Sequence, residues 1–174
     1  MAPSLRQSRQ TGYLFSNAAV VDRELGDLGY DLWASAGFVG RLRRDFERGR
    51  QFECLMQRQF VTGATLAFRA ELRERLAPIP EGLIWIHDGW IAVFLAASGI
   101  SGTALPDKLI SYRQHGDQQV GAPAPVGGTR RSERRWLRSG EPGFSVARLR
   151  KKHRELSGYR AAMKQSMTYL LERL

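Results

Sequence analysis

The sequence contains one cysteine, Cys54, among its 174 residues. A single cysteine excludes an intramolecular disulfide framework and a zinc site built on paired cysteines. Long apolar runs are also absent, because the most apolar stretch is Trp90–Ile100 and a bilayer-spanning helix needs about 20 residues. The start of the chain lacks the apolar segment of a secretory signal. We therefore expect a cytoplasmic protein, with peripheral attachment to the inner face of the membrane as an open alternative.

Acidic side chains are scarce in one part of the chain only. The sequence has 27 Lys and Arg against 17 Asp and Glu, a net charge of +10. Residues 1–129 carry 14 basic and 13 acidic side chains, whereas residues 130–174 carry 13 and 4. A balanced body argues against a nucleic-acid-binding fold, in which basic residues gather on the binding face. The excess positive charge is a property of the C-terminal segment.

The basic segment 130–174 has three interpretations. Apolar residues recur in it at steps of three and four, which predicts an amphipathic helix from about residue 145 to the end. These residues are Leu156, Tyr159, Met163, Met167, Leu170 and Leu174. The helix can pack this stripe on the body, which is our expectation, or it can lie on an anionic membrane surface. Stacking of Trp136 and Tyr159 on nucleic-acid bases is the third interpretation, and the balanced body disfavours it.

Hydrophobic patterning and turn residues predict a mixed α/β chain. The expected elements, in chain order, are a buried strand over 13–22, a helical region over 39–60 with a weak point at Gly49, a turn and short strand over 61–68, helical turns over 70–76, a buried helix over 87–98, and two extended pieces around Pro106 within 102–113. The Gly/Pro-rich stretch 121–128 then separates a domain over residues 1–128 from the helical tail over 129–174.

Familiar catalytic motifs are absent: GxGxxG, the P-loop, HExxH and GxSxG do not occur. Three weaker features remain. They are the small-residue turn Thr62–Thr65, the run His87-Asp-Gly-Trp90 at a predicted helix start, and the run Tyr112-Arg-Gln-His-Gly116 at a predicted strand end. Each is weak alone, so the order and spacing of the three carry the information.

In this order the features resemble the C-terminal half of family 2 glycosyltransferases of the GT-A fold, especially the rhamnosyltransferase-like bacterial members. The matching positions are Thr62, Gly63, Phe68, Pro78, Pro80, His87, Asp88, Trp90, Pro106, Leu109, Ile110, Tyr112, Arg113, Gln114, His115 and Gly116. Residues 15–22 also look like the strand that follows the sugar-nucleotide site, so the resemblance covers about residues 13–122. It implies a partial, helix-rich GT-A domain of the α/β class, followed by a basic helical tail.

The resemblance implies transfer of a sugar from a nucleotide-sugar to an acceptor hydroxyl, with inversion, on a surface-polysaccharide or lipid-linked acceptor. Such a reaction needs a general base, and Asp88 stands where inverting members place it. An Asp at a helix start is otherwise a capping residue. His115 stands where such enzymes often place a histidine near a divalent metal, manganese or magnesium, and the donor diphosphate. Its alternative is a histidine hydrogen-bonded at a strand end.

The same resemblance implies a set of further substrate-binding residues, namely Gly63, Thr65, His87, Trp90, Arg113 and Gln114. Gly63 would let the backbone approach the donor sugar, or it is an ordinary turn glycine. Arg113 suits a phosphate or an intramolecular ion pair. Trp90 suits the core or the wall of an acceptor pocket, and we expect His87 to support Asp88.

The motif with which this family holds its metal is missing. GT-A enzymes carry Asp-x-Asp just before the strand that matches residues 13–22, and no Asp-x-Asp occurs in this sequence. Asn17 also stands where relatives commonly have Asp. Because a metal-bound diphosphate needs anionic ligands, we expect little or no transferase activity and no tight metal binding by this chain alone. We expect a truncated, split or degenerate enzyme that lacks its N-terminal half, with an exposed sheet edge beside strand 13–22. A non-catalytic interaction protein is the alternative.

Overall fold

The structure is a computed structural model that describes residues 11–115, 121–125 and 146–174. The chain forms two compact units, which are described separately. The first unit contains residues 11–80 and 85–125. The second contains residues 81–84 and the helix α7, Val146–Arg173. The predicted α/β class is confirmed.

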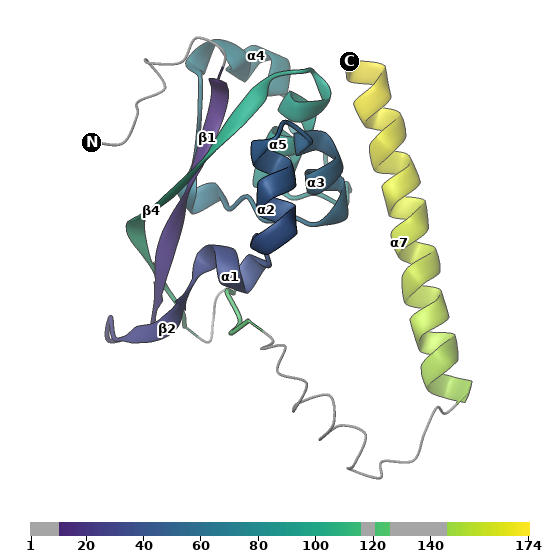
Figure 1. Ribbon diagram of the computed structural model, residues 1–174. Helices are drawn as coiled ribbons and strands as arrows, with labels where there is room; N and C mark the ends of the chain where they lie inside the picture. The colour runs from purple at the N-terminus through teal and green to yellow at the C-terminus, as the bar shows by residue number, and fades with distance from the viewer. Residues whose placement is uncertain (1–10, 116–120, 126–145) are drawn as a thin grey trace. The chain divides into compact units, whose positions relative to one another are not determined.

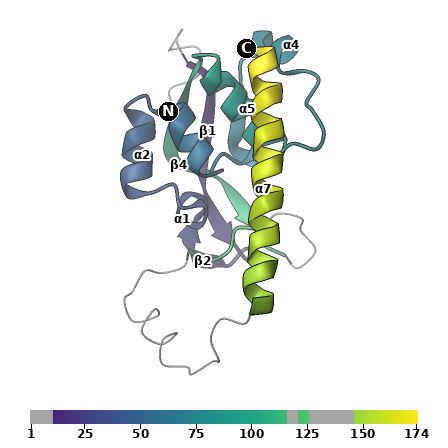
Figure 2. The same ribbon diagram turned by 90° about the vertical axis from the view of Figure 1, so that its right-hand side faces the viewer.

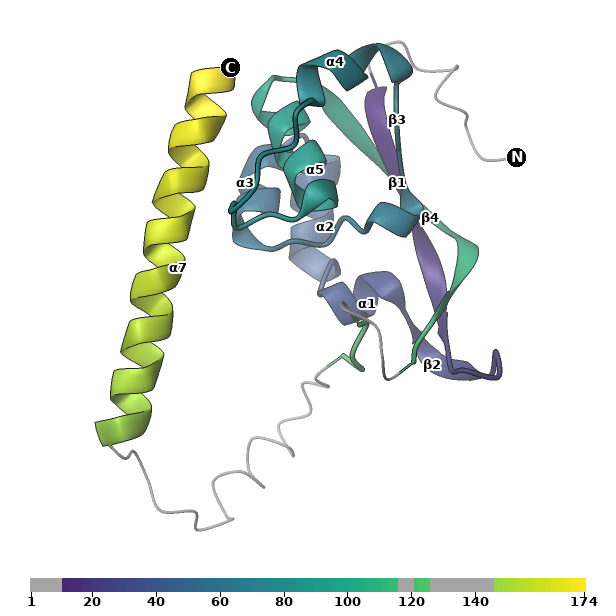
Figure 3. The same cartoon turned by 180° about the vertical axis from the view of Figure 1, so that it is seen from behind.

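A four-stranded mixed sheet forms the first unit, and its central strand is β1, Thr11–Val21. Strand β4, Ser101–Arg113, runs parallel to β1 along its whole length. Strands β2, Asp27–Asp31, and β3, Leu66–Phe68, pair antiparallel with the later and earlier parts of β1. A strand has only two edges, so β2 and β3 share the edge that β4 leaves free (Figures 1 and 3, with β3 labelled in Figure 3).

This topology corrects the prediction that strand 13–22 lies beside an exposed edge. β1 is paired on both edges, because strands from later in the chain flank it. Within the described residues, the long unpaired edge is the outer edge of β4. That edge carries Pro106, Asp107 and Lys108, and proline and charge are residue types that discourage edge-to-edge association.

The region around Pro106 also differs from the prediction of two extended pieces. β4 is one strand, and its register against β1 slips between Leu105, opposite Ser16, and Lys108, opposite Asn17. Pro106 therefore falls at an irregularity of the ladder, where its missing N–H removes no regular hydrogen bond. This placement lets a proline occur inside a continuous strand.

Short helices connect the strands and agree with most of the predicted ranges. They are α1 (Leu32–Ala36), α2 (Gly40–Glu47), α3 (Gln51–Gln57), the 3-10 turns η1 (Gly63–Thr65) and η2 (Ala70–Leu72), α4 (Arg73–Leu76) and α5 (His87–Ala97). α1, α2, α3 and α5 lie on one face of the sheet, as the front, side and back views show (Figures 1, 2 and 3). Gly49, at φ +92°, separates α2 from α3, which confirms the predicted weak point.

An aromatic cluster joins these helices to the sheet. Phe15 of β1 is fully buried, and its ring lies 5.5–5.8 Å from the rings of four residues in α1, the α1–α2 connection, α2 and the loop after α3. These four are Trp33, Phe38, Phe46 and Phe60. Phe38 also stacks on Phe60 at 4.2 Å. The cluster fixes how α1, α2 and the loop after α3 sit against β1.

A second connection ties α3 to the neighbouring ends of β1 and β4. The Gln51 side-chain amide donates to the Gly102 carbonyl at 2.8 Å, and its oxygen accepts from the Gly102 N–H at 2.7 Å. The hydroxyl of the buried Tyr13 donates to the same oxygen at 3.4 Å. One glutamine thus satisfies both backbone groups of a strand residue.

Gly102→Ala is expected to destabilise this unit by about 1–3 kcal/mol, the usual cost of overpacking. A Cβ at Gly102 would overlap the ring of Tyr13, which is fully buried, so the ring or the strand would have to shift. Urea unfolding followed by tryptophan fluorescence measures the change. Gly158→Ala, in α7 of the second unit, adds the same methyl group in open space and improves helix propensity, so as a control it should not lower the midpoint. A Gly102→Ala midpoint equal to that of the wild type would contradict the packing described.

Part of the Gly/Pro-rich stretch belongs to the first unit. Ala122 is buried in a small apolar cluster with Ala18, Val20 and Leu32. The Tyr30 hydroxyl donates to the Ala122 carbonyl at 2.8 Å. Residues 121–125 are therefore packed against β1 and α1 rather than serving only as a spacer.

The second unit confirms the predicted C-terminal helix. Within it, the buried Ser166 hydroxyl of α7 accepts a hydrogen bond from the Ile84 N–H at 3.0 Å. In the predicted apolar stripe, Leu170 is buried, Met163 and Met167 are half-buried, and Leu174 is exposed. The side chains of Leu156 and Tyr159, together with residues 126–145 and thus Trp136, lie outside the described residues. Packing of this helix on the body and its binding to a membrane both stay predictions. Among the described helices, none combines the length and the apolar character that a membrane span requires.

Candidate functional site

The candidate site is centred on the start of α5. Ile86 is the N-cap residue, its carbonyl accepts from the Trp90 N–H at 2.8 Å, and its own side chain makes no capping hydrogen bond. His87 and Asp88 are the first two helical residues. Asp88 is therefore not the capping residue that the simpler interpretation of its position assumed.

Three N–H groups converge on the Asp88 carboxylate. Oδ1 accepts from the Gln59 side-chain amide at 2.9 Å and from the Gly89 N–H at 2.7 Å. Oδ2 accepts from the Gly63 N–H at 2.8 Å. Asp88 is only 6% exposed, so these donors compensate for the water that burial removes from the carboxylate.

Gly63 reaches Asp88 because it has no side chain. A Cβ at this position would lie 2.8 Å from His87 Nε2 and 3.6 Å from Asp88 Oδ2. The first of these separations is shorter than a real Cβ contact, so a larger residue would displace the imidazole. The structure thus brings together Gly63, His87 and Asp88, three of the residues singled out from the sequence. The exposed His87 borders the buried carboxylate.

Two other predicted residues lie nearby in structural positions. Thr65 is buried, and its hydroxyl donates to the Thr62 carbonyl at 3.0 Å, which closes the η1 turn. Trp90 is fully buried and packs against Trp85 and Phe94. Its position is that of a core residue, which matches the first of the two interpretations given for it.

Arg113, Gln114 and His115 lie at the end of β4. Arg113 is opposite Val21 in the ladder, and the Gln114 N–H donates to the Val21 carbonyl at 2.8 Å. Arg113 and His115 are exposed, whereas Gln114 is half-buried. The donors to Asp88 come from Gln59, Gly63 and Gly89, so the β4 end is not part of the hydrogen-bond shell of Asp88. Gly116 of the matched run lies outside the described residues.

Asn17, the residue at which the sequence departs from the family pattern, has a structural role. Its side-chain oxygen is buried and accepts from the Ala18 N–H at 2.9 Å and the Trp33 N–H at 3.1 Å. The amide thus links β1 to the first turn of α1. The Trp33 indole donates back to the Ser16 carbonyl at 3.2 Å.

The sequence analysis missed Gln59, the side chain that contacts Asp88 from another part of the chain. Gln59 follows α3, is exposed overall, and lies 29 residues before Asp88. No local motif marks it. The signal in the sequence was two glycines. Gly89 lies against the Gln59 side chain and Gly63 lies against the Asp88 carboxylate, and a glycine often marks a place where another group comes close to the backbone.

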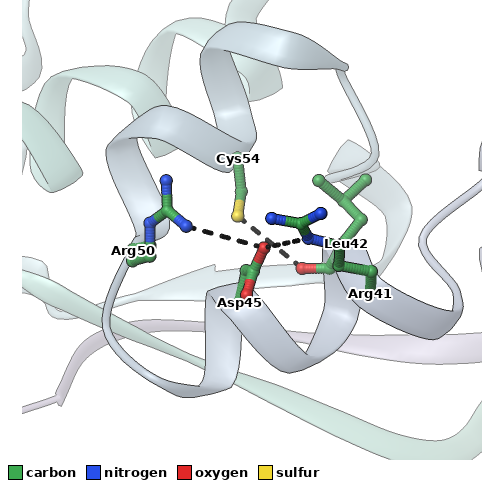
Figure 4. A network of polar contacts seen from close by, with 5 residues as sticks. All are labelled: Arg41, Leu42, Asp45, Arg50 and Cys54. Carbon is green, nitrogen blue, oxygen red and sulfur yellow. Dashed lines mark hydrogen bonds and ion pairs between the residues drawn. The ribbon is translucent and has the colours of Figure 1, made fainter.

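Cys54 lies in a separate polar group between α2 and α3 (Figure 4). Cys54 is 1% exposed, and its thiol donates to the Leu42 carbonyl at 3.6 Å. Burial raises the pKa of the Cys54 thiol, and the neighbouring Asp45 carboxylate raises it further. Asp45 itself pairs with Arg41 at 3.4 Å and with Arg50 at 3.8 Å. A buried thiol with a raised pKa is a poor nucleophile, so we assign this group a structural role.

The described part of the chain contains no cluster of three or more His, Cys, Asp or Glu side chains that could hold a metal ion. His115 alone does not amount to a site for manganese or magnesium, which favour several anionic oxygen ligands. No family model, curated protein or solved structure matches the chain.

Proposed function

We propose that this chain supplies the acceptor side of a sugar-transfer reaction from a nucleotide-sugar to an acceptor hydroxyl, with Asp88 as the general base. The observation that carries the proposal is the buried Asp88 carboxylate, which is oriented by three N–H donors and bordered by the exposed His87. The resemblance of the runs at Thr62, His87 and Tyr112 to family 2 glycosyltransferases supports the same assignment.

In the proposed reaction the acceptor oxygen bonds to the anomeric carbon of the donor as the nucleotide diphosphate leaves from the opposite side. The acceptor proton passes to Asp88, and the anomeric configuration inverts. Arg113, Gln114 and His115 are proposed contacts of the donor diphosphate. In this proposal the chain binds and activates the acceptor and contacts the donor diphosphate at the β4 end, while the rest of the donor site comes from a separate donor-binding half.

Turnover assays test whether this chain needs a separate donor-binding half. The chain alone is incubated with a panel of nucleotide-sugars, manganese and simple methyl glycosides as acceptors. It is compared with a fusion in which a donor-binding half that carries Asp-x-Asp precedes residue 11. We expect turnover from the fusion and none from the chain alone. Clear turnover by the isolated chain would contradict the requirement for a separate donor-binding half.

A further inference from the structure

We infer that Gln59 is a positioning residue for Asp88: its side-chain amide holds Oδ1 and leaves Oδ2 as the oxygen that takes the acceptor proton. This inference rests on the proposed function, and it adds a residue that the resemblance does not include. Three observations carry it: the donors to each carboxylate oxygen, the close approach of Gln59 to Gly89, and the position of Oδ2 beside Gly63 and His87.

The two oxygens of Asp88 are not equivalent. A carboxylate oxygen accepts about two hydrogen bonds. Oδ1 already accepts two, from Gln59 and from the Gly89 N–H, whereas Oδ2 accepts one, from the Gly63 N–H. Oδ2 therefore keeps one acceptor position for an incoming hydroxyl. Oδ2 lies 3.6 Å from the point that a Cβ at Gly63 would occupy, and His87 Nε2 lies 2.8 Å from the same point.

Gln59 can take this position because residue 89 is glycine. A Cβ at Gly89 would lie 2.8 Å from both Cδ and Nε2 of Gln59 and 3.0 Å from its Oε1. Gly89 does not adopt a positive φ, so helix geometry does not require glycine there. Alanine is in fact the better helix former. The Gln59 amide, which lies over residue 89, thus explains why α5 has glycine at this position.

Two variants remove the Gln59–Asp88 hydrogen bond in different ways. Gln59→Met keeps a side chain of similar length and removes the donor. Gly89→Ala keeps the donor and displaces it, because the flexible and exposed Gln59 must move away from the new methyl group. Gly89→Ala also improves helix propensity, so it should not lower the melting temperature. Gln57→Met, at an exposed position at the end of α3, is the matched control.

The experiment uses the full chain in NMR titrations with methyl α-rhamnoside and methyl β-glucoside. The amide resonance of Gly63 reports binding, and the carboxyl carbon resonance of Asp88 reports its hydrogen bonding. We expect both variants to shift the Asp88 carboxyl resonance and to weaken glycoside binding about tenfold, because a carboxylate that Gln59 no longer holds presents Oδ2 to the glycoside hydroxyl less often. Gln57→Met should bind like the wild type.

The outcomes separate this inference from the proposed function. If glycosides bind the wild type and Asp88→Asn weakens them, while both variants bind like the wild type, the positioning role of Gln59 is overturned and the proposed function stands. If no glycoside shifts the Gly63 resonance of the wild type, both are overturned. If Gly89→Ala leaves the carboxyl resonance and binding unchanged, the Gln59 amide is not held over Gly89 and Asp88 as described, and the inference is overturned while the proposed function stands.

Discussion

Replacing Asp88 by Asn in the fusion enzyme is expected to reduce turnover by about 10²–10⁴-fold, the usual contribution of a general base. The substitution keeps the size and shape of the side chain and removes its ability to take the acceptor proton. Donor affinity should stay within about twofold, because no described contact of Asp88 leads to the β4 end where the donor diphosphate is proposed to bind. The kcat and the dissociation constant of the donor, measured on the same preparation, separate the two effects.

The same variant also tests the hydrogen bonding of Asp88. An asparagine has one acceptor oxygen, so its NH2 group must face either the Gly63 N–H or the pair of donors at Oδ1. A donor facing a donor costs about 1–3 kcal/mol of stability. Kinetics are therefore compared well below the melting temperature, with Asp107→Asn on exposed β4 as the control. Turnover of Asp88→Asn within about threefold of the wild type would refute its role as the base.

Phe15→Ala is expected to reduce the free energy of unfolding of the first unit by about 3–5 kcal/mol. The fully buried Phe15 ring contacts four aromatic rings on separate segments, so its removal leaves a cavity that no single neighbour can fill. Small domains have a free energy of unfolding of only about 5–15 kcal/mol, so this variant should lose a large part of it. Guanidinium unfolding followed by circular dichroism measures the change.

Leu109→Ala is the control for Phe15→Ala. Leu109 is 54% exposed on β4, and a substitution there should change stability by no more than about 0.5 kcal/mol. A loss below about 1 kcal/mol in Phe15→Ala would show that the aromatic cluster does not hold the helices to the sheet. Equal losses in both variants would point to a general effect of truncation.

Elements with strong local signals were predictable from the sequence. The apolar run of β1, the break at Gly49, and the end of α5 near Gly99, at φ +72°, all follow from side-chain pattern and glycine chemistry. β2 and α1 were missed. β2 is a short, largely exposed strand whose partner is β1, and α1 has only five residues. Their positions depend on pairing and packing, which the local sequence does not specify.

In the candidate site too, residues with a local sequence signal were predictable and those set by long-range contacts were not. Gly63, His87 and Asp88 were singled out from the sequence, and the structure brings them together. Gln59 escaped notice because its contact with Asp88 joins segments far apart in the chain and leaves no local pattern. The continuity of β4 through Pro106 was hidden for a related reason, since a proline is tolerated there only because the ladder with β1 is already irregular.

The most direct test of the central claim, that Asp88 belongs to an acceptor-binding site, is an amide NMR titration of the full chain and of Asp88→Asn with methyl glycosides. We predict that saturating glycoside shifts the backbone amides of Gly63, His87 and Gly89 in the wild type, and that Asp88→Asn weakens the binding about tenfold. Absence of shifts at these amides, or binding that Asp88→Asn leaves unchanged, would contradict it.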